Sequence, residues 1–224
     1  MRKELRKLTK SLSKTENNLK NQVNLVNGAF STIYRSIIQD GIPLYRTKKG
    51  KNEGDLHKEY GYFITSQVGY LYIILRRLGK YKLLDLGSGP GIILMTLHHF
   101  LRSKRIEHRL AGYENEKVFV EQGKRCNLDI QNKDITKLTK EDVQDFDILY
   151  FWEPLIDKKL CDKFAKNLAK ITTENQIVVY QCSGRMGEYL NKQFELNKQF
   201  EEYDRNNIPG GFIVFYCKPK KEIR

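Results

Sequence analysis

The sequence predicts an α/β domain with a seven-stranded, mostly parallel sheet, one antiparallel strand, helices on both faces and an N-terminal helical extension. From residue 81 onward, short apolar runs typical of buried strands alternate with amphipathic helical segments. A glycine-rich turn follows the first of these runs. The last two strands have only residues 206–210 between them, which allows an antiparallel hairpin but no parallel crossover.

The N-terminal part predicts a separate basic extension, residues 1–59, before the main domain at 60–224. Apolar residues recur at helical spacing over residues 5–30, and such a helix must dock on its own domain, a second copy or a partner. The segment 40–58 is rich in Gly, Asn and charge, so it is either a lid or a surface loop. A helix over 60–78 follows, with Gly79 as its C-cap.

The remaining elements are expected in alternation along the chain. The apolar runs predict strands at 82–86, 109–113, 128–131, 146–151, 176–180, 194–203 and 211–217. The amphipathic segments between them predict helices at 91–101, 116–126, 155–170 and 186–192.

The turn after the first predicted strand is the main functional signal, and it reads Asp85-Leu86-Gly87-Ser88-Gly89-Pro90-Gly91. Glycines let a ligand approach the backbone closely, and the helix that follows offers unpaired N–H groups. A dinucleotide fingerprint would need its third glycine where Ile92 stands. The carboxylate of Asp85 would repel a pyrophosphate but suits a ligand that carries an amino group and a sulfonium charge.

This acidic residue followed by G-x-G-x-G resembles the first motif of class I S-adenosylmethionine-dependent methyltransferases, and the likeness extends over about residues 60–218. The resemblance implies S-adenosylmethionine as the cofactor. It implies that Glu114, at the end of the second strand with Asn115 beside it, accepts hydrogen bonds from the ribose hydroxyls. It places Asp134 beside the adenine amino group and Ile135 against the ring. The residues it assigns to cofactor binding are Asp85, Gly87, Ser88, Gly89, Gly91, Glu114, Asn115, Asp134 and Ile135.

The catalytic corner of the family follows the fourth strand, where this chain has Tyr150, Trp152 and Glu153. The corner lacks the D/N-P-P-Y/F pattern of amino-methylating DNA enzymes. Glu153 is suited to bind an ammonium or help remove its proton, and the two aromatic rings to form a cation–π wall. The alternative is that Trp152 packs under the cofactor and Glu153 caps the next helix. The layout is weakly similar to Dot1-like and FAM173-like lysine methyltransferases, although those proteins often carry an acidic residue after Gly-Ser-Gly, where this chain has Pro90.

The positive net charge has two interpretations that both stay open: a polyanionic partner, or a surface rich in solvated lysines. The formal net charge is +13, and thirteen of the 40 Lys and Arg fall in the first sixty residues against six Asp and Glu. The expected acceptor is a macromolecule, with a protein lysine or other amine slightly favoured. The alternatives are an RNA or DNA methyltransferase, a catalytically silent nucleic-acid-binding module and a small-molecule methyltransferase.

Several classes of protein are not expected. No apolar run is long enough for a membrane span, and the basic N-terminus lacks the apolar core of a secretory signal. The four cysteines are far apart and form no metal-binding pattern, so we expect reduced thiols in a cytoplasmic protein without a metal. The pair His98-His99 falls inside a predicted helix and is interpreted as packing and surface residues rather than metal ligands. The sequence leaves the oligomeric state open.

Overall fold

The computed structural model describes residues 68–69, 71–152, 154–155, 157–181, 186–196 and 212–219. The chain divides into two compact units, Met1–Ile74 and Leu75–Arg224. The first lies almost wholly outside the described residues, so the predicted extension 1–59, its helix at 5–30 and the segment 40–58 stay predictions.

The second unit is an α/β domain with a parallel sheet, as the sequence predicts. Most helices and strands begin and end close to the expected residues; of the strand expected over 194–203, only β6 at Phe194–Leu196 falls within the described residues. They follow in the order β1 (Lys82–Leu86), α3 (Ile92–Ser103), β2 (Arg109–Glu114), α4 (Lys117–Arg125), β3 (Asp129–Asn132), the 3-10 turn η1 (Ile135–Lys137), α5 (Lys140–Val143), β4 (Ile148–Phe151), α6 (Lys158–Ile171), β5 (Ile177–Gln181), α7 (Met186–Gln193), β6 (Phe194–Leu196) and β7 (Phe212–Pro219).

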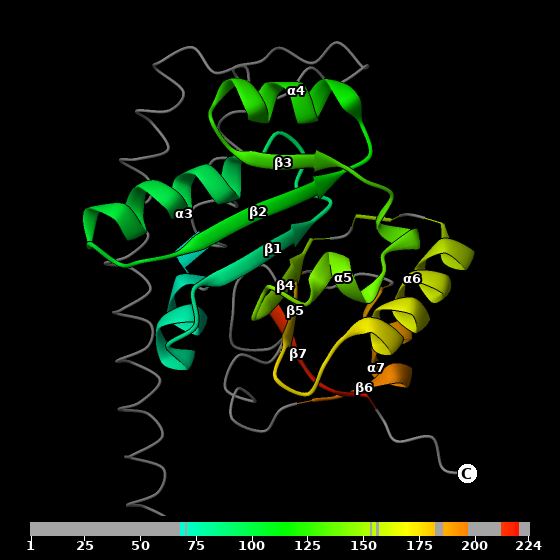
Figure 1. Cartoon of the computed structure of the whole chain (residues 1–224). Helices are drawn as coiled ribbons and strands as arrows, with labels where there is room; N and C mark the ends of the chain where they lie inside the picture. Colours follow the sequence, from blue (N-terminus) through cyan, green and yellow to red (C-terminus); the bar gives the residue numbers. More distant parts are fainter. Residues whose placement is uncertain are drawn as a thin grey trace, which may run out of the picture. The chain divides into compact units, whose positions relative to one another are not determined.

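The strands form one sheet in the order β3-β2-β1-β4-β5-β7-β6 (Figure 1). The neighbours from β3 to β5 all pair in parallel. Strand β7 runs antiparallel to both β5 and β6. The chain steps outward from β1 in one direction through β2 and β3, and in the other through β4 and β5. This creates a switch point between β1 and β4, the place where open α/β sheets bind ligands at their carboxyl ends.

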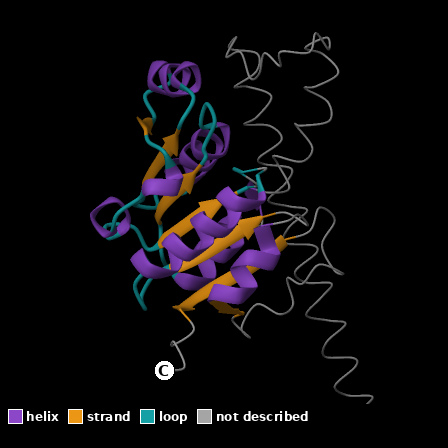
Figure 2. Cartoon of the chain, turned by 90° about the vertical axis from the view of Figure 1, so that its right-hand side faces the viewer, coloured by secondary structure: helices purple, strands orange, loops and turns teal. Residues whose placement is uncertain are grey.

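Helices lie on both sides of the sheet (Figure 2). The side chains of one face pack with α5, α6 and α7 in a core whose largest fully buried members are Phe151, Phe164, Tyr180 and Phe194. The ring of Phe151 lies edge-on to that of Phe164, at 5.2 Å between centroids. Successive strand residues point to opposite faces, so Asp85 and Tyr150 belong to the other face, which α3 covers.

The helix before β1 ends as predicted at Leu78. Gly79 has a φ of 62°, in the left-handed region that favours glycine. The N–H of Gly79 donates to the carbonyl of Arg76, and the N–H of Lys80 to the carbonyl of Leu75. These two bonds form the Schellman motif, which satisfies the free carbonyls of a helix end.

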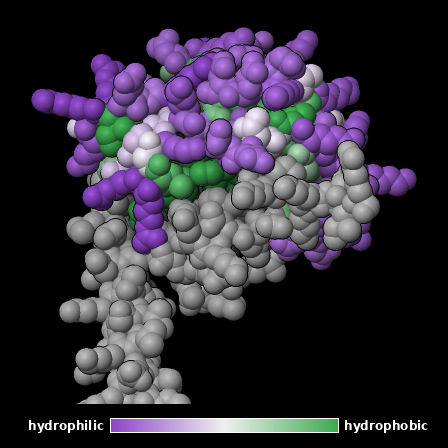
Figure 3. Space-filling model, turned by 60° about the horizontal axis from the view of Figure 1, so that its bottom comes forward, coloured by the Kyte–Doolittle hydropathy of each residue, from purple (hydrophilic) through white to green (hydrophobic). Residues whose placement is uncertain are grey.

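The surface of the described part is mainly hydrophilic on the face shown in Figure 3. Among the described residues, the exposed large apolar side chains are Val118 and Leu160. None of the described helices is long and apolar enough to cross a membrane.

Candidate functional site

The glycine turn after β1 is fixed by its own backbone. Gly87, Gly89 and Gly91 have φ values of 89°, 55° and 82°, so each adopts a conformation that other residues rarely tolerate. The N–H groups of Gly87 and Ser88 both donate to the carbonyl of Tyr113, at 2.8 and 3.1 Å. This pair of bonds ties the turn to β2. The G-x-G-x-G spacing is therefore the pattern of left-handed residues that this turn requires.

Close packing adds a second reason for glycine at two of these positions. A Cβ on Gly87 would lie 2.5 Å from the Cβ of Pro154, in the corner after β4. A Cβ on Gly91 would lie 2.6 Å from the side chains of Leu128 and Ile130. The turn thus contacts the β4 corner on one side and the start of β3 on the other.

The carboxylate of Glu114, at the end of β2, points back into the glycine turn. Its Oε2 accepts a hydrogen bond from the N–H of Gly89 at 2.8 Å. Its Oε1 accepts from the N–H groups of Asn115 and Glu116, at 2.8 and 2.9 Å. An ionised carboxylate has about four acceptor positions, so these three bonds leave about one, on Oε2, for a ligand hydroxyl.

Asn132, at the end of β3, is a residue that the sequence analysis missed. Its side-chain amide donates to the carbonyl of Glu114 at 3.0 Å and to the carbonyl of Asn115 at 2.8 Å. The N–H of Lys133 donates to the same Glu114 carbonyl. Asn132 therefore holds the β2 corner in place from the neighbouring strand. A polar residue at a strand end was the available signal, but the sequence does not reveal the two partners.

Asp134 follows β3 and caps η1. Its Oδ1 accepts from both the N–H and the hydroxyl of Thr136, at 2.9 and 2.7 Å, and its Oδ2 pairs with Lys137. The hydrogen bond from the Thr136 hydroxyl is the main cause that lowers the pKa of Asp134 below its ordinary value. The next residue, Ile135, is buried. Asp134 is thus ionised and rigidly placed beside an apolar side chain.

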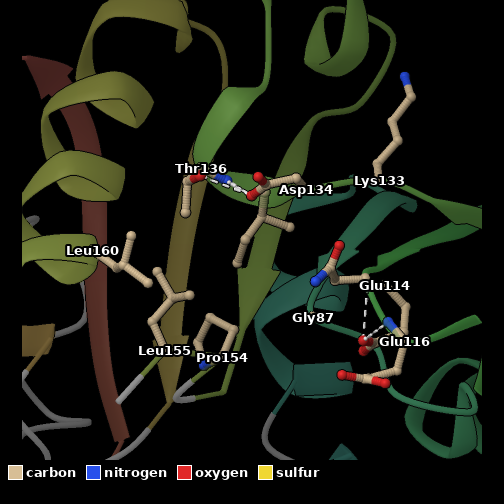
Figure 4. Close-up of a pocket in the computed structure, with 11 residues that line it drawn as sticks. Gly87, Glu114, Glu116, Lys133, Asp134, Thr136, Pro154, Leu155 and Leu160 are labelled. Carbon is tan, nitrogen blue, oxygen red and sulfur yellow. Dashed lines mark hydrogen bonds between the residues drawn. The ribbon is translucent and has the colours of Figure 1, made fainter. Parts of the chain in front are cut away.

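A cavity of about 360 Å³ opens at the carboxyl ends of β1 to β4, at the switch point of the sheet. Figure 4 shows its two unlike sides. Carboxylates from the β2 corner lie on one side, and an apolar wall from the β4 corner and α6 lies on the other. Its lining comprises Gly87, Glu114, Asn115, Glu116, Lys133, Asp134, Ile135, Thr136, Pro154, Leu155 and Leu160. The apolar wall of Pro154, Leu155 and Leu160 was not predicted from the sequence.

Asp85 lies away from this lining. Its side chain is 2% exposed, and its neighbour across the β1–β4 pairing is Tyr150. Burial, and secondly the charge of Glu114, raise the pKa of Asp85 to about 8. At neutral pH Asp85 is therefore mostly protonated in this structure, and it does not present the charged carboxylate that the sequence predicts opposite a cationic ligand.

The predicted catalytic corner is described in part. Tyr150 is fully buried within β4, and Trp152 is half-buried in the bend that follows. Glu153 lies outside the described residues, so its predicted roles stay predictions. The corner is positioned beside the cavity, because Pro154 and Leu155 line it and Pro154 touches Gly87. Among the described residues, no cluster of three or more His, Cys, Asp or Glu could hold a metal ion.

Solved structures similar to this chain include methyltransferases. An S-adenosylmethionine-dependent methyltransferase from Clostridium acetobutylicum shares 16% identity over 51% of this chain and 48% of its own, with a TM-score of 0.38. PKMT2 from Rickettsia typhi, in complex with AdoHcy, shares 22% identity over 47% of this chain and 21% of its own, with a TM-score of 0.38. A putative S-adenosyl-L-methionine-dependent methyltransferase from Methanococcus maripaludis shares 14% identity over 80% of this chain and 100% of its own, with a TM-score of 0.49.

The chain spans about half the length of the first of these proteins and about a fifth of the second. At such identities and TM-scores, a likeness carries no argument about activity, cofactor or acceptor. No protein-family model and no curated protein matches the sequence.

Proposed function

We propose that this chain is a class I S-adenosylmethionine-dependent methyltransferase whose cofactor occupies the cavity at the carboxyl ends of β1 to β4. The observation that carries the proposal is the carboxylate of Glu114. It joins the glycine turn of β1 to the β2 corner, and it lines the cavity at the switch point. The resemblance in motif order assigns that same residue to the ribose.

The residues present fit this cofactor. A volume of about 360 Å³ is within the range of small-molecule sites. The one acceptor position left on Glu114 suits a ribose hydroxyl. Ile135 and the apolar wall of Pro154, Leu155 and Leu160 suit the faces of an aromatic ring. The bare backbone at Gly87, which lines the cavity, allows the ligand to approach without meeting a Cβ.

When bound, S-adenosylmethionine supplies a methyl group on a positively charged sulfur. In the transfer, a lone pair of the acceptor forms a bond to the methyl carbon while the carbon–sulfur bond breaks and its electrons stay on sulfur. An amine acceptor then loses a proton. The protein mainly aligns the two reactants and excludes water. The β4 corner beside the cavity is where this chain presents the acceptor.

The acceptor is a macromolecule in this proposal. A protein lysine or other amine, as in the Dot1-like and FAM173-like enzymes, would use Glu153 and the ring of Trp152. A nucleic acid is the alternative acceptor, and the exposed lysines along α6 favour it. A catalytically silent nucleic-acid-binding module is a separate candidate, which would bind RNA or DNA but transfer no methyl group.

Two glycine substitutions test the cofactor site. Gly89→Ala strains a residue with a φ of 55°, whose N–H donates to the cavity-lining carboxylate of Glu114. Gly79→Ala imposes the same kind of strain at a φ of 62°, where a Cβ meets nothing within 4 Å and the residue does not line the candidate cavity. We expect S-adenosylhomocysteine to bind the wild type and Gly79→Ala with equal affinity in isothermal titration calorimetry, and Gly89→Ala at least tenfold more weakly. Equal binding by both variants would refute the site.

Labelled methyl transfer tests the activity and the acceptor together. The full chain and radiolabelled S-adenosylmethionine are incubated with a fractionated lysate, and the products are digested with nuclease or protease. Label that protease releases identifies a protein acceptor, and label that nuclease releases identifies a nucleic acid. Cofactor binding without any incorporation would support the silent module instead.

A further inference from the structure

The outer face of α6 carries a line of four lysines. Lys159, Lys163, Lys166 and Lys170, here called the α6 lysine row, are all exposed. Their spacing of four, three and four residues places them on one stripe of the helix. The opposite stripe packs into the core through Cys161, Phe164, Ala165, Leu168 and Ile171. The row therefore projects directly away from the sheet.

The row has little compensating negative charge. Among the described residues, Lys166 is the member of this row that forms an ion pair; its Nζ lies 2.7 Å from Oδ2 of Asp162. Asp162 is also the only acidic residue within α6, which holds five lysines in its 14 residues. The row thus presents an excess of positive charge to solvent.

This arrangement is locally unfavourable for the helix. Like charges four residues apart, as in Lys159 with Lys163 and Lys166 with Lys170, repel each other by a few tenths of a kcal/mol. Lys158 and Lys159 also place cations at the positive end of the helix dipole, where the N-cap carboxylate of Asp157 offsets part of their charge. Features that violate a local preference without a packing benefit are typical of functional surfaces.

The row begins at the candidate cofactor cavity. Leu160 lines the cavity, and Lys159 precedes it on the first turn of α6. At about 1.5 Å per residue, the row extends about 17 Å from there along the helix axis. This length covers several successive phosphates of a nucleic acid strand.

We propose that the α6 lysine row binds the phosphate backbone of a nucleic acid and leads it toward the cavity. The composition favours nucleic acid over an acidic protein. Protein–protein interfaces are depleted in lysine and have an apolar centre. Surfaces that bind nucleic acid are rich in positive charge and contact phosphates through Lys and Arg. The role of the row as a guide for an acceptor rests on the proposed function, whereas binding itself does not.

A charge-removal experiment tests the row. The triple variant Lys159→Gln/Lys163→Gln/Lys170→Gln removes three charges and keeps the Lys166–Asp162 pair. The control Lys117→Gln/Lys124→Gln/Arg125→Gln removes three exposed charges from α4, which packs against β3. Binding of each full-length variant to a labelled single-stranded RNA is followed by fluorescence anisotropy between 50 and 200 mM NaCl. Circular dichroism checks that the variants are folded.

We expect the wild type and the α4 control to show similar salt dependence. The α6 variant should bind at least tenfold more weakly at 100 mM NaCl. The slope of log affinity against log salt should fall by about 0.7 for each lost phosphate contact, or about 2 in all. Equal loss in both variants, an unchanged slope, or tighter wild-type binding to an acidic peptide than to RNA would each overturn the proposal. Binding of S-adenosylhomocysteine is measured in parallel: its absence in the wild type would refute the proposed cofactor but not the row.

Discussion

Replacing Glu114 by Gln is the sharpest perturbation of the candidate site, because the shape of the side chain stays while one oxygen becomes an NH₂ group. The carboxylate accepts three backbone N–H bonds, from Gly89, Asn115 and Glu116. A glutamine can keep the two bonds on Oε1 only by turning its NH₂ group toward the N–H of Gly89. That N–H then faces another donor and loses its partner.

The size of the effect follows from the surroundings of each bond. The bonds from the N–H groups of Asn115 and Glu116 are exposed, so water can accept hydrogen bonds from these N–H groups when the bonds to Glu114 are lost. The bond to Gly89 is partly buried, and a hydrogen bond to a charged group contributes about 1.5–3 kcal/mol. We therefore expect Glu114→Gln to lower the free energy of unfolding by about 2 kcal/mol, and binding of S-adenosylhomocysteine to fall at least tenfold.

Glu116→Gln is the matched control. Glu116 lines the same cavity and carries the same charge, but its side chain makes no capping hydrogen bond to α4. Urea unfolding followed by circular dichroism should separate the two variants, with a midpoint for Glu114→Gln lower by about 1 M at a typical slope of about 2 kcal/mol per M. If both variants unfold at the same urea concentration, the bond to Gly89 does not hold the turn, and the reasoning is refuted.

Two other residues give independent predictions. Asn132→Ala removes the two side-chain bonds to the carbonyls of Glu114 and Asn115, so we expect the free energy of unfolding in urea to fall by about 1–2 kcal/mol and cofactor binding to weaken. Asn132→Asp, whose side chain has no N–H to donate, should restore neither the stability nor the binding. Asp85 keeps its proton up to about pH 8 in the folded state, while the unfolded chain loses it near the ordinary value of 3.8. The folded state then binds more protons between these values, so Asp85 makes stability fall as pH rises, by up to about 1.4 kcal/mol per pH unit. Asp85→Asn should remove that decline between pH 5 and pH 7, and an unchanged pH dependence of urea unfolding would contradict the assignment.

The helices and strands could be predicted where the sequence has a buried apolar run or an amphipathic helical pattern. The strand at Lys82–Leu86 follows from a short apolar run, and the helix at Lys158–Ile171 from an amphipathic pattern. The turn η1 and the short helix α5 were missed because neither is long enough to show a helical apolar period. Thr139 and Asp142 form a capping box at α5, a signal that the sequence does contain.

The sequence by itself determined the parts of the site that depend on neighbouring residues. Strand, turn and helix follow one another around Gly87, Gly89 and Gly91 because these positions need left-handed backbone, which glycine alone adopts without strain. The presence of carboxylates after successive strands also follows from the order of residues.

Only the tertiary structure decided which of these groups meet. Glu114 reaches Gly89, and Asn132 reaches Glu114, because β2 lies between β1 and β3 in a fixed parallel register. The same packing buries Asp85 and brings Pro154 against Gly87. Strand order and register depend on how the whole core packs, and local sequence preferences do not encode contacts between residues so far apart in the chain.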